Sequence, residues 1–369
     1  MSHSVAESEY SAYYKIWTNR GDLDGIPQAE TGDELQARVL VFLEQFMMST
    51  TTQIVVTHAG FIRAMINTIM NRDRTTVVDI SHSKIHLISN PWNEINYKKI
   101  KEDSKKTIYF IETVNKKYVM KVFNSPITAY DVFQYNLLKK HEDLILFPKI
   151  LALFQRRNSN HDYKIKVFEF LDGEHMSGVI EEEIENKVIM ATYDMYKLLN
   201  MNIDMGYSLE KYVPNLLVKM CDVFNNLEES EVKNLGCSLL GNSDFIHFLS
   251  NECNSFVNYD IHRKNVIFDG EVRFIDLESI ILSPKEFQLG SLISAFFMLE
   301  NTHYPFECVI DIWPEKYNHV KVIYMSIARC FLGAAHFQIK VQNNTGHELE
   351  NKLLIAKYME VSERLSLYI

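Results

Sequence analysis

The segment NYDIHRKNVIFDGEVRFIDLES, residues 258–279, decides the fold expected for this chain of 369 residues. Two short apolar stretches, NVIF and VRFIDL, flank an Asp-Gly pair at 269–270, which strongly favours a β-hairpin turn. Such a hairpin would place Asn265 just before one strand and Asp276 near the end of the other. Asp260, in the preceding loop, would then converge on both.

These three polar residues suit a phosphoryl-transfer site. Such a site needs a carboxylate that orients or deprotonates the attacking hydroxyl, and hard oxygen ligands for Mg²⁺. Asp260 fits the first task, and Asn265 and Asp276 fit the second. Because Asp and Asn also cap turns around ordinary hairpins, the three residues alone leave both interpretations open.

The chain before this hairpin contains the elements of a small lobe. INYKKIKED, KKTIYFIET and KKYVMKVF are typical of an antiparallel meander, and Lys121 lies in the third segment. A helical segment, AYDVFQYNLLKKH, and two strands, in LFPKILALF and YKIKVFEFLDGEHM, follow it. Beyond the turn at Asp172-Gly173 the chain becomes largely helical, as in EIENKVIMATYDMYKLLNMNI.

The order of these features resembles the aminoglycoside phosphotransferase and choline kinase family, which are relatives of the protein kinases. The resemblance spans about residues 91–369. It implies an α+β, protein-kinase-like fold with an antiparallel-sheet N-lobe over 91–168, a hinge at 169–173 and a helical C-lobe over 174–369.

The resemblance also implies roles for individual residues. Lys121 matches the lysine that contacts the nucleotide phosphates. Asp260 matches the catalytic base, and Asn265 and Asp276 match the Mg²⁺ ligands. The hinge backbone that hydrogen-bonds adenine is matched by Glu169, Phe170 and Leu171. The expected cofactors are therefore Mg²⁺ and ATP, or GTP in its place.

Three departures from the family pattern concern supporting residues. Asn258 and Tyr259 stand where the family usually has His-Gly. The helix after Lys121 offers Gln134 or Asp131 where a glutamate usually pairs with the lysine, and a neutral Gln134 would hold that lysine less firmly. Gln288 replaces a common aspartate, which we expect to reduce loop rigidity more than chemistry.

The N-terminal segment has a different pattern. Residues 33–48 form an amphipathic helical stripe, and a short apolar strand at 54–56 is followed by a second helix from about Phe61. His58 lies where that strand meets the helix, and Arg63 lies in the first helical turn, where backbone N–H groups favour an anion.

ETGDELQARVLVFLEQF followed by IVVTHAGFIRAMIN resembles the later part of the histidine phosphatase (phosphoglycerate mutase-like) superfamily, over about residues 8–90. The resemblance implies that Glu30 matches the proton donor and His58 the phosphate-binding histidine. The nucleophilic histidine of that family lies in an Arg-His-Gly motif, which is absent from this sequence. Residues 1–90 are thus expected to be a partial α/β segment without catalysis.

Losing the first strand of such a domain would leave sheet edges exposed. We therefore expect the N-terminal segment to dock against the second domain or to mediate self-association as a homo-oligomer. A phosphatase half that another chain completes in trans remains an alternative.

Composition limits the partners and the compartment. The formal charge of −10 argues against nucleic acid and favours a cationic small molecule. The N-terminus lacks the pattern of a signal peptide, and no run of eighteen apolar residues predicts a membrane span. The five cysteines are widely spaced without a C-x-x-C pair, which fits a reducing cytoplasm.

We accordingly expect an ATP- and Mg²⁺-dependent kinase that phosphorylates a hydroxyl of an amine- or sugar-containing metabolite. A catalytically decayed nucleotide-binding or scaffold protein is the main alternative. Aromatic residues near the C-terminal end are candidates for an acceptor pocket, although most aromatics at helical spacing belong to a core. They are Tyr304, Phe306, Trp313, Tyr317, Phe331 and His336.

Overall fold

The computed structural model describes residues 30–47, 57, 59–70, 72, 96–103, 105–114, 116–157, 162–176, 182–201, 213–299, 306–344 and 346–368. Contacts divide the chain into two compact units. The first holds the described residues up to Glu142 and Pro148–Phe170, and the second holds Asp143–Phe147 and the residues from Leu171 onward. This division falls inside the predicted hinge, whereas the boundary expected after residue 90 lies within the first unit.

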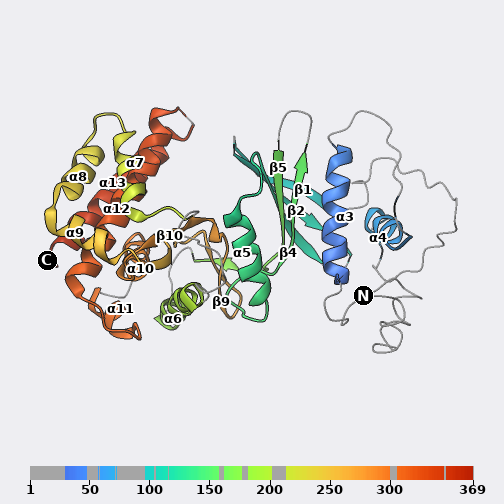
Figure 1. Cartoon of the computed structure of the whole chain (residues 1–369), viewed down its shortest axis with the longest axis horizontal. Coiled ribbons are helices and arrows are strands. Elements are labelled where there is room, and N and C mark those ends of the chain that lie inside the picture. The colour runs from blue at the N-terminus through green and yellow to red at the C-terminus, as the bar shows by residue number, and fades with distance from the viewer. Residues whose placement is uncertain are drawn as a thin grey trace. The chain divides into compact units, whose positions relative to one another are not determined.

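A five-stranded antiparallel sheet forms the centre of the described part of the first unit (Figure 1). The strands, in the spatial order β1-β2-β3-β5-β4, are β1 (Asn96–Glu102), β2 (Lys106–Glu112), β3 (Lys117–Phe123), β4 (Ile150–Arg157) and β5 (Asp162–Glu169). The predicted meander is thus confirmed as β1, β2 and β3. Helix α5 (Ala129–Lys140) follows β3 and begins with a capping box, in which Thr128 and Asp131 each accept a hydrogen bond from the other's backbone N–H.

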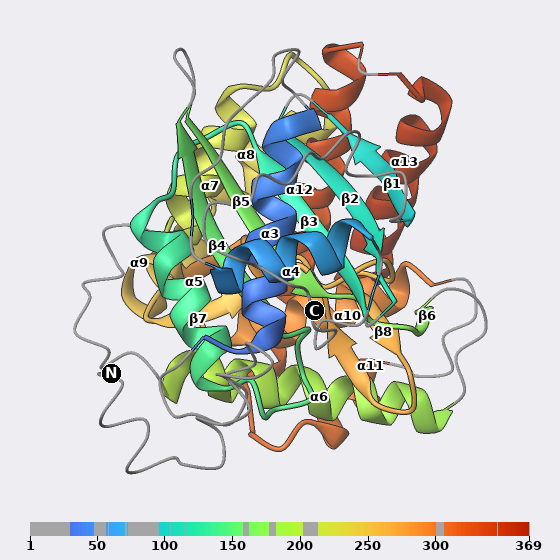
Figure 2. The same ribbon diagram turned by 90° about the vertical axis from the view of Figure 1, so that its right-hand side faces the viewer.

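The two faces of this sheet bury different kinds of side chain. Successive residues of a strand point to opposite faces, so Tyr118, Met120 and Val122 of β3 enter an apolar cluster while Lys121 faces the other way. Helix α3 (Gly32–Met47) covers the apolar face, and α5 lies against the face that carries Lys121 (Figures 1 and 2).

Helix α3 and helix α4 (Ala59–Ile69) confirm the two helices predicted in the N-terminal segment. A capping box fixes the start of α3: Thr31 Oγ1 accepts a hydrogen bond from Glu34 N at 3.2 Å, and Glu34 Oε2 accepts one from Thr31 N at 2.8 Å. Leu40 and Leu43 of α3 are buried in the same cluster as the apolar face of the sheet. The predicted strand at 54–56 lies outside the described residues.

A buried polar contact joins α3 to the sheet across a long sequence separation. The Tyr118 hydroxyl donates to Gln36 Oε1 at 2.8 Å, and Gln36 Nε2 donates to Thr113 Oγ1 at 3.4 Å. Gln36 and Tyr118 are both buried, so this contact satisfies polar groups that would otherwise be costly to bury. The N-terminal segment was expected to dock against the domain predicted over residues 91–369. The contact of α3 with the five-stranded sheet, inside the first unit, is such a docking.

The second unit is mainly helical and carries two small sheets in its described part. Strand β7 (Ser255–Asn258) pairs with β10 (Ile280–Ser283), and a second sheet has the order β6-β8-β9. Its strands are β6 (Glu174–His175), β8 (Val266–Phe268) and β9 (Val272–Phe274). The helices are α6 (Glu182–Met201), α7 (Leu216–Asn225), α8 (Glu231–Gly241), α9 (Ser243–Glu252), α10 (Glu286–Phe297), α11 (Phe306–Ile312), α12 (His319–Gln342) and α13 (Glu348–Ser366).

Helix α12 is the central helix of this unit and packs closely against α10. A Cβ atom added at Gly290 of α10 would lie 2.8 Å from the backbone nitrogen of Ser326 in α12, so only glycine permits this approach. In the described part of the chain, α12 alone has the length and hydropathy of a membrane span, and 72% of that window is buried within the protein. This burial is typical of a core helix.

Candidate functional site

The loop that carries the predicted catalytic residues begins where β7 ends. Asn258 is the last residue of β7 and pairs with Ile280 of β10. The chain then passes through residues 259–265 into the β8–β9 hairpin, whose turn contains Gly270 with φ of +99°. The predicted hairpin is thus confirmed, with glycine at the position whose backbone most residues avoid.

The hairpin brings Asn265 and Asp276 to the same end of the ladder. The backbone N–H of Ile275 donates to Asn265 O at 2.9 Å, one step beyond the pairing of Val266 with Phe274. Asp276 follows directly, in a left-handed conformation with φ of +78° and ψ of +71°. A non-glycine residue in this region carries strain of about 1–3 kcal/mol, which is most often retained where it serves a function.

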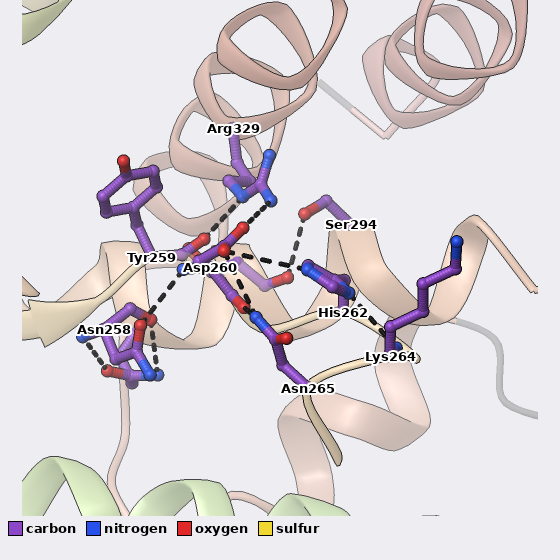
Figure 3. A network of polar contacts seen from close by, with 10 residues as sticks. Asn258, Tyr259, Asp260, His262, Lys264, Asn265, Ser294 and Arg329 are labelled. Atoms are coloured by element: carbon purple, nitrogen blue, oxygen red, sulfur yellow. Dashed lines mark hydrogen bonds and ion pairs between the residues drawn. The ribbon is translucent and has the colours of Figure 1, made fainter. Parts of the chain in front are cut away.

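Asn265 also contacts Asp260 directly. Its Nδ2 atom donates to the backbone oxygen of Asp260 at 3.0 Å and to Asp260 Oδ2 at 3.2 Å (Figure 3). Because the amide nitrogen is engaged with Asp260, the amide oxygen of Asn265 is the atom that suits a cation. The structure therefore brings the three predicted residues into one loop-and-hairpin cluster.

The chemistry of these oxygen atoms fits Mg²⁺. Mg²⁺ prefers oxygen ligands and is commonly held by one or two protein groups together with water and substrate phosphates. The carboxylate of Asp276 and the amide oxygen of Asn265 match that requirement. The described residues contain no group of three or more His, Cys, Asp or Glu that would enclose a metal by themselves.

Asn258 and Gln288 depart from the pattern of the aminoglycoside phosphotransferase and choline kinase family, and both form hydrogen bonds beside the loop. Gln288 of α10 accepts from Asn258 N through Oε1 at 3.0 Å and donates to Asn258 O through Nε2 at 3.2 Å. Asn258 Oδ1 in turn accepts from Asp260 N at 3.2 Å. An amide at position 288 thus supplies both a donor and an acceptor to the loop, whereas an ionised aspartate supplies only acceptors.

His262 lies beside both aspartates and was not singled out from the sequence. Its Nε2 is 3.7 Å from Asp260 Oδ2, and its Nδ1 accepts a hydrogen bond from Lys264 N at 3.1 Å. Burial lowers the pKa of His262, and Arg329 lowers it further against the opposing effect of the Asp260 and Asp276 carboxylates. Because Nδ1 accepts from the Lys264 backbone, the neutral form of the imidazole carries its hydrogen on Nε2, on the side of Asp260.

Arg329 is the second residue that sequence reasoning missed. It lies on α12, far along the chain, and its guanidinium reaches Tyr259 O and Asp260 Oδ1 (Figure 3). The available signal was one arginine inside the apolar run SIARCFLGAA, which a helix would bury.

Comparison with solved structures identifies the fold. The chain resembles choline kinase LicA from Streptococcus pneumoniae at 12% identity over 73% of this chain and 93% of that chain, with a TM-score of 0.50. It also matches a spectinomycin phosphotransferase in complex with ADP and spectinomycin (13% identity, 74% and 93%, TM-score 0.48). A thermostable mutant of an aminoglycoside phosphotransferase in complex with AMP-PNP and hygromycin B gives 10% identity, 73% and 93%, and a TM-score of 0.49. The chain has a protein-kinase-like fold.

The N-terminal segment gives a separate match. Residues 1–98 match the model of the histidine phosphatase superfamily, branch 1. This confirms the second resemblance seen in the sequence. No curated protein matches the chain in sequence.

In the kinase-like fold, the strand lysine Lys121 lies on β3 directly opposite Lys166 of β5. Its Nζ is 5.5 Å from the centre of the Phe168 ring. The expected partners of Lys121 on α5 contact other lysines. Gln134 Oε1 accepts from Lys166 Nζ at 2.5 Å, and Asp131 binds both Lys166 and Lys164, at 2.9 Å and 2.8 Å.

These β5 lysines correct the sequence-based interpretation of α5. Lys166 is almost fully buried, and a buried ammonium requires a carboxylate and hydrogen-bond acceptors around it. Asp131 and Gln134 provide them from consecutive turns of α5. The alternation of β5 placed Lys166 on this face, but the sequence did not reveal that α5 would lie over it.

Asp131 gives the first unit a specific sensitivity to acid. Burial alone would raise the pKa of Asp131, but Lys166, Lys164 and Thr128 outweigh it and lower the pKa to about 2 from 3.8. Between these values the unfolded chain binds the proton more readily, so we expect about 2 kcal/mol of stability, present above pH 4, to be lost as the pH falls toward 2. Urea unfolding of the wild type and Asp131→Asn at several pH values would test this, and an equal loss in both proteins would contradict it.

The predicted hinge residues connect the two units. Glu169 N donates to Lys149 O at 3.0 Å, and Phe170 N donates to Lys117 O at 3.0 Å. The backbone N–H groups of Glu169 and Phe170 are therefore hydrogen-bonded to residues at the ends of neighbouring strands.

The phosphatase-like residues do not form a catalytic group in the described structure. Glu30 receives two hydrogen bonds from Arg38, at 2.9 Å to Oε1 and 2.6 Å to Oε2, and the guanidinium of Arg38 lies over the Phe61 ring. Arg63 lies within α4, and His58 lies outside the described residues. Glu30, the predicted proton donor, is thus held in an ion pair.

The aromatic candidates for an acceptor pocket belong mainly to the core of the second unit. Those that are buried are Phe306, Trp313, Tyr317 and Phe331. His336 is exposed, and Tyr304 lies outside the described residues. Burial in α11, α12 and the segment between them fits a packing role for the buried four.

Proposed function

We propose that this protein is an ATP- and Mg²⁺-dependent kinase that phosphorylates a hydroxyl of a small amine- or sugar-containing metabolite. The observation that carries the proposal is the pair of hydrogen bonds from Asn265 Nδ2 to the backbone and carboxylate oxygens of Asp260. Asp276 lies at the end of the same hairpin as Asn265. The kinase-like fold supports it, because the solved structures of this fold include a choline kinase and aminoglycoside phosphotransferases.

The proposed reaction assigns one task to each group. The carboxylate of Asp260 accepts a hydrogen bond from the acceptor hydroxyl and takes its proton as the oxygen attacks the γ-phosphorus. The bond to the β–γ bridging oxygen breaks, and ADP leaves. Asn265 and Asp276 would hold Mg²⁺, which, when bound, supplies positive charge to the phosphates. Lys121 would contact those phosphates from β3.

The net charge supports a cationic acceptor. A net charge of −10 favours a positively charged acceptor over an anionic one. An amine-bearing alcohol or aminosugar meets this preference, whereas an acidic sugar does not. The nucleotide-consumption assay described below distinguishes ATP from GTP.

The N-terminal segment serves this kinase as a structural cover in our proposal. The apolar side of α3 is buried against the sheet, and Glu30 is paired with Arg38. A phosphatase completed in trans would first have to release Glu30, its matched proton donor, from this ion pair, so we favour the structural role.

The direct test is nucleotide consumption by the purified full chain with Mg²⁺, ATP or GTP, and a panel of choline, ethanolamine, aminoglycosides and neutral sugars. We expect ADP or GDP release that depends on one class of acceptor. Nucleotide binding without turnover on any acceptor would instead support a decayed nucleotide-binding protein.

Asp276→Ala tests the metal assignment separately. Removing this carboxylate should eliminate the Mg²⁺-dependent part of ATP binding, which calorimetry with and without Mg²⁺ would measure. If the variant binds Mg·ATP as tightly as the wild type, Asp276 is not a ligand and the proposed site is wrong.

A further inference from the structure

Arg329 is a buried cation whose polar contacts converge on the catalytic loop. Its side chain is 5% exposed. Burying an arginine is costly unless hydrogen bonds and a counter-charge compensate. Its neighbours on α12, Ala328 and Cys330, are fully buried and supply no such group.

The partners of Arg329 are two consecutive residues of the loop. Nε donates to the backbone oxygen of Tyr259 at 2.6 Å, and Nη2 lies 3.4 Å from Asp260 Oδ1. The guanidinium is also 5.9 Å from the ring centres of Tyr259 and Tyr358. A planar guanidinium with several fixed N–H groups can hold a backbone oxygen and a carboxylate at the same time, which lysine cannot do equally well.

Asp260 is thereby held from two sides. Asn265 Nδ2 contacts Oδ2, and Arg329 Nη2 contacts Oδ1. The backbone N–H of Asp260 donates to Asn258, while its backbone oxygen accepts from Asn265. With one contact on each carboxylate oxygen, the carboxylate plane is fixed.

We propose that Arg329 is a positioning residue for phosphoryl transfer: it fixes the loop through Tyr259 and orients the Asp260 carboxylate toward the acceptor hydroxyl. This inference rests on the proposed function. It assigns a role to a residue of α12 that contacts neither nucleotide nor acceptor in the proposed reaction.

Arg329→Met tests the inference, because methionine keeps an apolar side chain of similar length while removing every donor. We expect kcat to fall about 100-fold, as a misplaced catalytic group does, with the KM for ATP nearly unchanged. Arg329→Lys retains the charge, but a lysine can satisfy only one of the two acceptors at a time. We expect its kcat to lie about tenfold below that of the wild type. Arg364→Met is the control. The guanidinium of Arg364 lies over the Phe297 ring, and its replacement should leave kcat unchanged.

Hydrogen exchange provides a readout that does not depend on turnover. The amides of Asp260 and Asn265 are hydrogen-bonded within the loop, to Asn258 Oδ1 and to His262 O. We expect faster exchange at these two amides in Arg329→Met and Arg329→Lys, and wild-type exchange in Arg364→Met.

The outcomes separate this inference from the proposed function. Wild-type kcat and wild-type loop exchange in Arg329→Met overturn the inference and leave the kinase intact. If Arg329→Met does not fold, the same two measurements on Arg329→Lys decide. If the wild type transfers no phosphate to any acceptor, the proposed function fails and its catalytic consequence at Arg329 fails with it, while the exchange of the loop amides in Arg329→Lys still supports or overturns the fixing of the loop by Arg329.

Discussion

Replacing Asp260 by asparagine is expected to lower kcat roughly 1,000-fold, the middle of the range for losing a general base. The carboxylate is the group of the loop that is oriented on both oxygens, by Arg329 and Asn265, and an amide cannot accept the hydroxyl proton. Because Asp260→Asn leaves Asn265 and Asp276 in place, Mg·ATP binding should remain close to that of the wild type. Steady-state kinetics with the active acceptor and calorimetry of Mg·ATP binding measure the two effects.

Asp269→Asn is the matched control for this change. Asp269 lies at the turn of the same hairpin, and its carboxylate pairs with Arg273 at 3.2 Å. The same carboxylate-to-amide substitution there should alter kcat less than about twofold, since a partly exposed ion pair contributes about 1 kcal/mol or less to stability and none to the chemistry. Equal losses in the two variants would mean that the hairpin acts only through its stability, and would remove Asp260 from the reaction.

Replacing Leu40 of α3 by aspartate is expected to destabilise the first unit by more than about 4 kcal/mol. Leu40 is fully buried in the cluster shared by α3 and the sheet. The variant loses the apolar burial of leucine, about 2–3 kcal/mol, and places an unpaired charge in an apolar environment. Since a domain is commonly stable by 5–15 kcal/mol, most of the margin of this unit would be lost.

Hydrogen exchange of the β3 and β5 amides, combined with urea denaturation, would locate this loss. Glu30→Gln, two residues before α3 begins, is the control, because Glu30 is partly exposed and its pair with Arg38 is worth about 1 kcal/mol or less. Unchanged protection of β3 and β5 in Leu40→Asp would show that α3 is not part of the sheet's core. A large effect would make the phosphatase-like segment a folding element of the kinase-like sheet.

The local elements could be predicted because their signals lie within a few residues. The Asp-Gly pair at 269–270 supplied the turn of the β8–β9 hairpin, and the spacing of Asp260, Asn265 and Asp276 then followed from strand geometry. The stripe of apolar residues after Asp33 predicted α3 for the same reason. Helix and strand periodicity is a property of neighbouring residues, so no distant contact was needed.

The partners across the fold could not be predicted in the same way. The sequence pointed to Gln134 and Asp131 as partners of Lys121, but the structure shows them bound to Lys166, because α5 packs on the β4–β5 side of the sheet. No sequence pattern connected Arg329 with Asp260, which lies 69 residues earlier. Such choices depend on which faces pack together.

The sequence by itself determined the kinase-like order of elements, the hairpin with its three polar residues, and the absence of an Arg-His-Gly motif from the 369 residues. Tertiary structure alone decided that α3 covers the apolar face of the sheet, that Glu30 pairs with Arg38, and that Arg329 of α12 contacts the loop that carries Asp260. The physical reason is that backbone periodicity is encoded locally, whereas buried charges and apolar faces find their partners only when distant elements pack together.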